Sequence, residues 1–154
     1  MPQRLAPDAG RAQVCRMRQA VHHLVVETDG PGLVEVTDAV RQWLAEQAVG
    51  TGLLTIWCRH TSASLLVQEN ADPDVRADLL AFFRRVVPEG TGYRHQDEGP
   101  DDMPAHIKAA LTSTQLSVPV ERGRLVLGTW QGIYLFEHRA RPHQRELVLH
   151  LIGG

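Results

Sequence analysis

The chain has 154 residues and a formal net charge of −2, and 43% of its residues are hydrophobic. A chain of this length forms one domain that buries about 70% of the surface its unfolded form would expose, so folding needs no disulfide or metal. The charge balance offers no basic surface for nucleic acid, and no apolar run approaches the roughly 20 residues that span a bilayer. We therefore expect small molecules or copies of the chain itself as partners, with no nucleic acid and no membrane.

The start of the chain is polar and lacks the continuous apolar segment of a secretory signal, so a cytoplasmic location is the default expectation. We divide the chain into an N-terminal extension, residues 1–17, and a single domain, residues 18–154. Two cysteines, Cys15 and Cys58, are too few and too far apart for a disulfide framework or a CxxC zinc site. In a reducing compartment both should be thiols.

The first elements of the domain follow from side-chain periodicity. Residues 17–27 are rich in β-branched side chains and predict a strand that ends at the turn Asp29–Gly32. A short strand should follow at residues 33–36. Thr37 is then the expected N-cap of an amphipathic helix that Gly50 closes, because apolar residues recur at helical spacing between them.

Two strands and a helix are expected next. Residues 53–60 and 64–69 are rich in strand formers and should be two strands joined at a kink at Thr61–Ala63. Asp72-Pro73 predicts a helix start, because aspartate caps free amides and proline suits the first helical position. The apolar residues from Val75 to Val86 then form one face of that helix.

The second half contains a long loop, residues 89–102, which is of the length that is usually functional or disordered. Pro104 opens a further helix that runs to Leu111. Strands are expected at residues 115–120, 125–137 (with a break near Gly128 or Gly132) and 146–152. Strands outnumber crossover helices and tight turns separate the last three, which favours a largely antiparallel α+β fold.

A first group of reactive side chains lies at the end of the strand 53–60. With the alternation of a strand, Cys58, His60 and Ser62 would share one face, which would place a thiol, an imidazole and a hydroxyl in one site. The alternative is a half-buried strand whose hydroxyls satisfy a turn. The closeness of His60 and Ser62 in sequence is no evidence for a nucleophile and its base, because such partners normally meet through the fold.

A second group precedes the helix that starts at Asp72. Glu69 and Asn70 offer oxygens to a cation or a substrate hydroxyl just before a helix N-terminus, whose amides also suit a phosphate. For Asp72 itself the structural role, capping the helix, competes with a catalytic one.

A third group is the acidic loop from His95 to Asp102, followed by His106. Two imidazoles that bracket four carboxylates supply the ligand types of divalent metals, although the spacing matches no compact metal motif. A charged surface loop without a ligand is the alternative.

The fourth group is Gly128-Thr129-Trp130-Gln131-Gly132, where glycines inside a strand pattern indicate a bulge or a close backbone approach. Trp130 packs in the core or covers a pocket. The polar triplet Glu137–Arg139 then closes the strand, either as a substrate or subunit contact or as an exposed strand end.

Four sequence segments taken together are more informative than the spacing of single reactive residues. His60–Ser64, Asn70–Pro73, Asp101–Lys108 and Gly128–Ile133 resemble, in this order, the YjbQ family, which is also called the secondary thiamine-phosphate synthase family. The resemblance runs from about His22 to Ile152.

The resemblance implies a compact, largely antiparallel β-sandwich with flanking helices, assembled as a homotrimer with a site near the subunit boundary. The family's site residues correspond to His60, Glu69, Asp72, His95 and His106. We assign catalysis to His60, Asp72, His95 and His106, substrate binding to Ser62, Glu69, Asn70, Thr129 and Gln131, and metal binding to His60, His95 and His106.

The family's name implies a transferase that joins a pyrimidine pyrophosphate to a thiazole phosphate, as a main or a secondary activity. That reaction needs a cation to hold the departing pyrophosphate and donors around the developing charge, so the expected cofactor is a divalent metal, magnesium or zinc. The alternatives are a metal-dependent hydrolase of a small phosphorylated metabolite and a non-catalytic trimer that binds a metabolite or anion.

Overall fold

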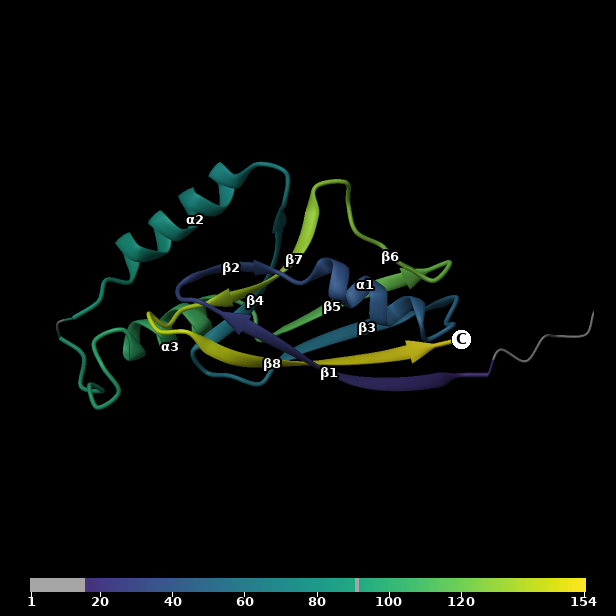
Figure 1. The fold of residues 1–154 in the computed structure, drawn as a ribbon, viewed down its shortest axis with the longest axis horizontal. Helices are drawn as coiled ribbons and strands as arrows, with labels where there is room; N and C mark the ends of the chain where they lie inside the picture. Colours follow the sequence, from purple (N-terminus) through teal and green to yellow (C-terminus); the bar gives the residue numbers. More distant parts are fainter. Residues whose placement is uncertain (1–15, 91) are drawn as a thin grey trace, which may run out of the picture.

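Figure 1 shows the computed structural model of the protein, which describes residues 16–90 and 92–154. In chain order its elements are β1 (Arg18–Thr28), β2 (Gly32–Glu35), α1 (Thr37–Ala45), β3 (Thr51–Cys58), β4 (Ala63–Glu69), α2 (Pro73–Val86), α3 (Asp102–Leu111), β5 (Gln115–Glu121), β6 (Arg124–Leu125), β7 (Gln131–Glu137) and β8 (His143–Gly153). Nearly all of the predicted extension, together with Cys15, lies outside the described residues. None of the described helices is long and apolar enough to cross a bilayer.

The strands form two antiparallel sheets. The larger has the order β1-β8-β3-β5-β6 and the smaller the order β2-β7-β4. Strand β8, near the end of the sequence, lies between β1 and β3 and pairs with both along most of its length. The predicted α+β class with largely antiparallel strands is therefore confirmed.

One hydrophobic core joins the two sheets. It takes inward-facing residues from both, among them Leu54, Ile56, Leu65, Ile133, Leu135, Leu147 and Leu149. Alternation along the strands explains this set, since every second residue of a strand points to the same face. The opposite face of the larger sheet carries exposed apolar side chains, which include Val21, Val25, Leu53 and Trp57.

The kink predicted at residues 61–63 proves to be a crossing between sheets. Strand β3 ends at Cys58 in the larger sheet and β4 begins at Ala63 in the smaller one. Helix α3 follows from the acidic loop and contacts β4 (Figure 1). The crossing therefore brings the residues around His60 close to the start of α3.

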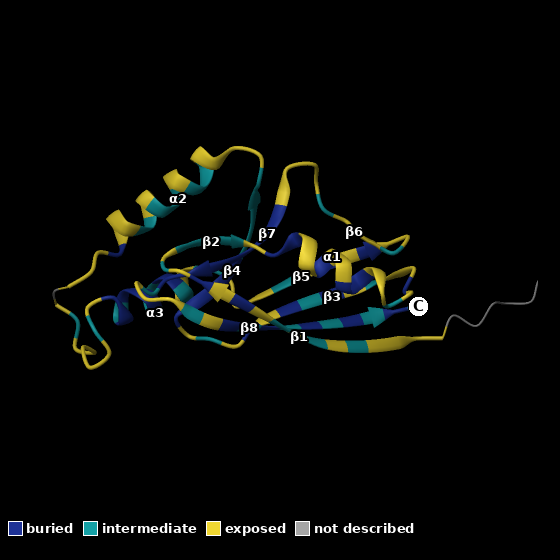
Figure 2. Cartoon of the chain, viewed as in Figure 1, coloured by how far each residue is buried: buried dark blue, intermediate teal, exposed yellow. Residues whose placement is uncertain are grey.

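Helix α2 begins as predicted but packs loosely. The Asp72 side chain accepts a hydrogen bond from the Asp74 amide at 2.9 Å, and Pro73 is the first helical residue. No residue of the helix is buried, and Figure 2 shows its outer side exposed along its length. Phe83 makes an edge-on contact with Phe136, while Phe82 and Val86 remain about half exposed. The predicted apolar face exists, but the single chain does not cover it.

Of two local predictions, one was wrong and one is confirmed. Val36, not Thr37, is the N-cap residue of α1, because the Thr37 hydroxyl donates to Glu35 and accepts from the Ile133 amide of β7. The break predicted near Gly128 in the region 125–137 is confirmed, since residues 126–130 separate β6 from β7.

Candidate functional site

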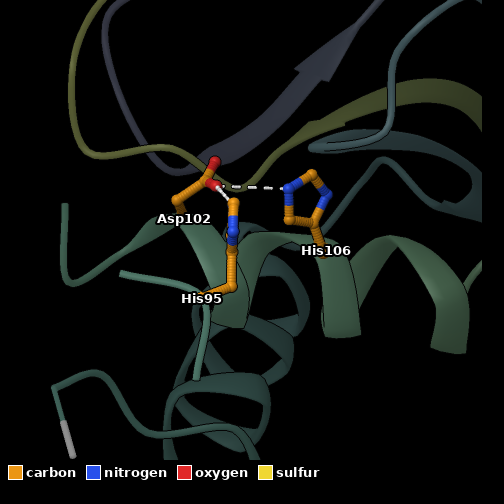
Figure 3. Close-up of side chains that lie close together, drawn as sticks. All are labelled: His95, Asp102 and His106. Carbon is orange, nitrogen blue, oxygen red and sulfur yellow. Dashed lines mark hydrogen bonds and ion pairs between the residues drawn. The ribbon is translucent and has the colours of Figure 1, made fainter. Parts of the chain in front are cut away.

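Three side chains at the start of α3 form a compact cluster. Nε2 of His95 lies 2.8 Å and Nε2 of His106 lies 3.2 Å from the same oxygen of Asp102, Oδ2 (Figure 3). One ligand atom from each residue lies within 4.8 Å of the others. We call these three residues the His-Asp-His cluster. It brings together two of the three predicted metal ligands.

Helix geometry and the acidic loop together position the cluster. Asp102 and His106 are four residues apart on α3 and so lie on the same face of the helix. His95 reaches them from the loop that precedes the helix. The Asp102 side chain is 2% exposed, whereas those of His95 and His106 are 43% and 31% exposed. The carboxylate thus forms the buried back of a site whose imidazoles reach solvent.

Arg139, just after β7, fixes the carboxylates from behind. Its Nη1 donates to Asp102 Oδ1, and its Nε donates to Asp101 Oδ2 at 2.9 Å. Burial alone would raise the pKa of Asp101, but hydrogen bonds from the Ala140 amide and from Arg139 outweigh it and hold that pKa below its usual value. Asp101 therefore stays ionised, and Oδ2 of Asp102 is the oxygen that faces the imidazoles.

His106 lies between two oxygen acceptors. Its Nδ1 is 2.9 Å from the Thr61 carbonyl oxygen, which can only accept, so Nδ1 carries a hydrogen and donates it. The neutral ring then has a bare lone pair at Nε2, which faces Asp102 Oδ2 at 3.2 Å. Two lone pairs at that distance repel each other. The geometry is favourable only with a proton or a metal ion between them.

His60, the third predicted metal ligand, does not belong to this cluster. Its Nε2 accepts a hydrogen bond from the Glu146 amide at 2.8 Å. Burial, aided by the charge of Arg145, lowers the pKa of His60. His60 is thus a neutral ring that is already bonded to the backbone of β8, although it adjoins Thr61, which contacts His106.

The face predicted to join Cys58, His60 and Ser62 does not form, because strand alternation ends with β3 at Cys58. Cys58 is a buried free thiol whose Sγ contacts the Ala63 carbonyl at 3.5 Å, and burial raises its pKa. Ser62 is also buried, and its hydroxyl accepts from Arg145 Nη2 at 3.1 Å.

Most of the predicted substrate-binding residues lie at the far end of the smaller sheet. Strand β4 has seven residues, so its two ends are roughly 20 Å apart. The crossing that leads to the His-Asp-His cluster is at one end. At the other end, around the end of β4 and the start of β7, are Glu69, Asn70, Asp72, Thr129 and Gln131. Within one chain the structure does not bring the two groups together.

Several residues of this distal group have structural contacts. The Asn70 amide donates to Glu35 at 3.0 Å, and the Gln131 side chain accepts from the Gly128 amide at 2.8 Å. Asp72 caps α2, as its structural interpretation predicted. Glu69 and Thr129 are the members for which the structure gives no side-chain hydrogen bond.

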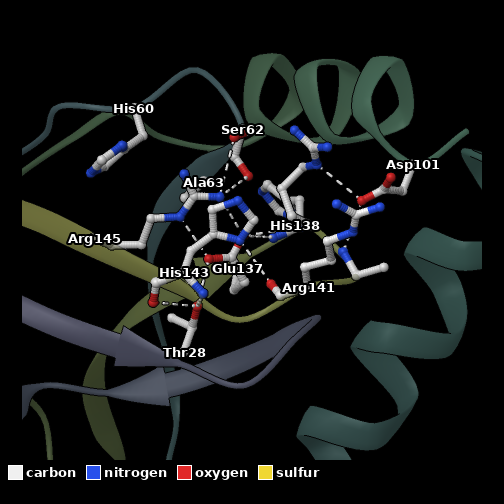
Figure 4. Close-up of polar contacts among 12 residues, drawn as sticks. Thr28, His60, Ser62, Ala63, Asp101, Glu137, His138, Arg141, His143 and Arg145 are labelled. Atoms are coloured by element: carbon white, nitrogen blue, oxygen red, sulfur yellow. Dashed lines mark hydrogen bonds and ion pairs between the residues drawn. The ribbon is translucent and has the colours of Figure 1, made fainter. Parts of the chain in front are cut away.

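A buried ion pair lies beneath the crossing (Figure 4). Arg145 donates to both oxygens of Glu137 at 2.6 Å, and Thr28 adds a third hydrogen bond at 2.8 Å. Burial would raise the pKa of Glu137, but the bonds from Arg145, the Arg139 amide and Thr28 keep it below its usual value. Ser62 accepts from the same guanidinium, so the pair anchors the crossing to β7 and β8.

The fold and the cluster define a class: an α+β protein of two antiparallel sheets with a His-Asp-His cluster at the start of a helix. Residues 22–154 match the family model of the UPF0047 proteins that resemble YjbQ, and the chain belongs to this family. This confirms the resemblance found in the four sequence segments.

Relatives and solved structures agree with that assignment. A UPF0047 protein from Synechocystis is 53% identical over 137 residues, which cover 88% of this chain and 93% of the relative. YjbQ from Escherichia coli O157:H7 is 45% identical over 84% of this chain and 95% of its own. An uncharacterised YjbQ/UPF0047 protein from Clostridium acetobutylicum has a TM-score of 0.79 at 34% identity, covering 84% of this chain and 98% of that one. A YbjQ-like protein of unknown function from Sulfolobus solfataricus shares the fold, with a TM-score of 0.84 at 24% identity over 90% of this chain and 100% of that one.

Proposed function

We propose that this protein is a divalent-metal-dependent enzyme acting on a small phosphorylated metabolite, as a transferase that joins a pyrimidine pyrophosphate to a thiazole phosphate. The metal dependence is supported by the position of His106 between the Thr61 carbonyl and Asp102. His95 contacts the same Asp102 oxygen, Oδ2. The reaction itself rests on the family resemblance.

The residues of the cluster fit a metal ion. A tetrahedral zinc ion with bonds of about 2.0–2.2 Å has ligand atoms roughly 3.4 Å apart. The two Nε2 atoms lie 2.8 and 3.2 Å from Asp102 Oδ2, so little movement would be needed. Thr61 and Arg139 orient His106 and Asp102 from outside, as outer partners of metal ligands do. Two imidazoles favour zinc over magnesium.

The exposure of the ligands suits an incoming phosphate. A bound divalent ion neutralises phosphate oxygens and stabilises a departing pyrophosphate. His95 and His106 reach solvent, while Asp102 is held from behind by Arg139. The chain's own residues thus fix the ligand geometry and leave the solvent side open to the metabolite.

We further propose that the protein is a homotrimer in which a neighbouring copy completes the site. The distal group that includes Glu69 and Gln131 is roughly 20 Å from the crossing within one chain. The exposed apolar face of the larger sheet offers a surface for self-association. The number three comes from the family resemblance.

A metal-dependent hydrolase of a small phosphorylated metabolite is the second candidate. It is favoured by the count of ligands, because three protein ligands with an open position are typical of catalytic zinc sites. A trimer that binds a metabolite or anion without turnover is the third.

Metal titration of protein purified without a histidine tag tests the proposal. After chelation, the parent should bind zinc at least about tenfold more tightly than His95→Ala or His106→Ala, because each loses one of three ligands. His23→Ala, which changes an exposed histidine outside the cluster, should bind like the parent. Zinc affinity should fall as the pH is lowered, since protons compete for the imidazoles.

Turnover then separates the reactions. Formation of thiamine phosphate from the two precursors with magnesium or zinc supports the transferase. Release of inorganic phosphate without coupling supports the hydrolase, and metal binding without turnover supports the binding protein. A parent that binds zinc no better than His106→Ala would show that the metal site is wrong.

A further inference from the structure

His138, just after β7, has a buried ring nitrogen without a partner. The residue is 2% exposed, and its Nε2 lies 2.9 Å from the Ser64 hydroxyl. Its Nδ1 makes no hydrogen bond, and it is the one such buried side-chain atom in the part of the chain that the structure describes. Buried polar groups nearly always have a partner, so this atom points to a missing one.

The ring lines a small recess between α2, α3 and the end of β7. The recess has a volume of about 20 Å³. That volume holds a single water-sized group, since one such group needs roughly 10–15 Å³. Its walls include Arg84, Glu89, Lys108, Phe136, Glu137 and His138. The site is therefore a polar pocket with an aromatic wall.

The balance of charge in the recess is positive. Lys108 is 7% exposed, and its ammonium has no ion pair or hydrogen bond within residues 16–90 and 92–154. Arg84 adds a second cation from α2, while Glu89 adds one negative charge. Glu137 contributes no free charge because Arg145 pairs with it. Two cations against one free anion give the recess a net positive charge, so it favours an anion over water.

The recess is separate from the His-Asp-His cluster. Helical residues turn by about 100° each, so Lys108, two positions after His106, points to the opposite side of α3. His138 and Arg139 are neighbours in sequence, but their side chains point to different sites. Arg139 contacts Asp101 and Asp102, whereas His138 contacts Ser64.

We propose that this recess binds a small oxyanion, a phosphate or carboxylate, which inserts one oxygen between His138 and Lys108 and places the rest beside Arg84. When the Ser64 hydroxyl donates to His138 Nε2, the hydrogen is on Nδ1, which has no other partner and is free to donate to that oxygen. The ligand thus receives hydrogen bonds from an imidazole, an ammonium and a guanidinium, a combination suited to anions. The inference stands independently of the metal centre.

Titration with inorganic phosphate tests it by calorimetry. The protein carries His95→Ala and is treated with chelator, so that no metal at the His-Asp-His cluster can hold the phosphate. Lys108→Met should weaken phosphate binding at least about tenfold, because it removes a charge-assisted contact at nearly constant volume. Arg84→Met should weaken it less, since Arg84 is exposed. Arg85→Met is the matched control and should change nothing, because Arg85 lies over the Phe82 ring on another side of α2.

A second readout protects the test against a variant that fails to fold. In the chain with Lys108 intact, phosphate should shift the NMR signals of the His138 ring nitrogens and leave those of His23 unchanged. The same titration is repeated with acetate and with a phosphate monoester. A tighter monoester assigns the site to a phosphorylated metabolite, and equal affinities assign it to the free anion.

Two results would overturn the proposal. One is the absence of a phosphate-dependent shift at His138 up to about 10 mM, which would leave an ordered water as the occupant. The other is phosphate binding that Lys108→Met does not weaken although the variant is folded.

Discussion

The two carboxylate oxygens of Asp102 have different partners. Oδ1 accepts from Arg139, which arrives from the end of β7, and Oδ2 faces both imidazoles. The guanidinium compensates the burial of the carboxylate and fixes its rotation. In the proposed metal site, a ligand oxygen is therefore held in place before the ion binds, which reduces the ordering that binding requires.

At the same scale, His138 should make stability depend on pH. Burial, with the charge of Lys108 adding to it, lowers the pKa of His138 from 6.5 to about 3. Between these values the unfolded chain binds a proton that the folded chain does not, so the free energy of unfolding falls as the pH is lowered from about 6.5 to 3. The full shift corresponds to about 5 kcal/mol. Denaturant unfolding measured across this range checks the slope.

The variant His138→Asn isolates that effect. It should be less stable than the parent at pH 7, because it loses the imidazole's packing and contact with Ser64, but its stability should fall less on acidification. His23→Asn, at an exposed position, should keep the parent's pH dependence. A parent and a His138→Asn variant with equal slopes would show that folding does not lower the pKa of His138.

The cluster was only partly predictable from the sequence. His95 and His106 stood out as ligand types, and the four-residue spacing of Asp102 and His106 was a further signal that places both on one helix face. Arg139 carries no such signal, because it meets Asp102 only after β7 has paired in the smaller sheet. The shared face of Cys58, His60 and Ser62 was predicted wrongly because the strand alternation behind that prediction ends at Cys58.

At the scale of elements, α2 depends on its cap more than a buried helix would. It has no buried residue, so little packing compensates for a lost terminal hydrogen bond. Asp72→Ala should lower the free energy of unfolding by about 1 kcal/mol. Asp78→Ala, an exposed position inside the same helix, is the control and should change it little. Equal effects of the two substitutions in denaturant unfolding would argue against the cap.

The existence of the elements was easier to predict than their partners. Asp72-Pro73 marks the start of α2 by local chemistry, and local chemistry operates in the fold as it does in a peptide. Nothing local shows that β3 and β4 enter different sheets, because both are apolar runs of similar composition. Thr37 illustrates the same limit, since its hydroxyl serves β7 rather than its own helix.

At the scale of the whole molecule, the outer face of the larger sheet should control assembly. Leu53 and Trp57 of β3 and Val21 and Val25 of β1 are exposed on that face. We expect Trp57→Glu to dissociate the proposed trimer, because it places a charge in an apolar contact. Light scattering at micromolar concentration measures the mass.

Trp130→Glu is the matched control for that prediction. Trp130 is also exposed, but it lies before β7 and outside the larger sheet. The variant should keep the parent's mass. A parent that is monomeric at micromolar concentration would contradict the trimer itself, and a Trp57→Glu trimer would place the interface on another face.

The position of β8 between β1 and β3 also sets an order of events during synthesis. The larger sheet cannot close until its second strand in space, which is its last in sequence, has been made. Ribosomes add roughly 5–20 residues per second, so β1 waits on the order of ten seconds for its partner. During that interval the nascent chain presents β1 as an unpaired edge, the kind of edge that recruits other chains. Translation is therefore the stage at which this protein is most exposed to aggregation.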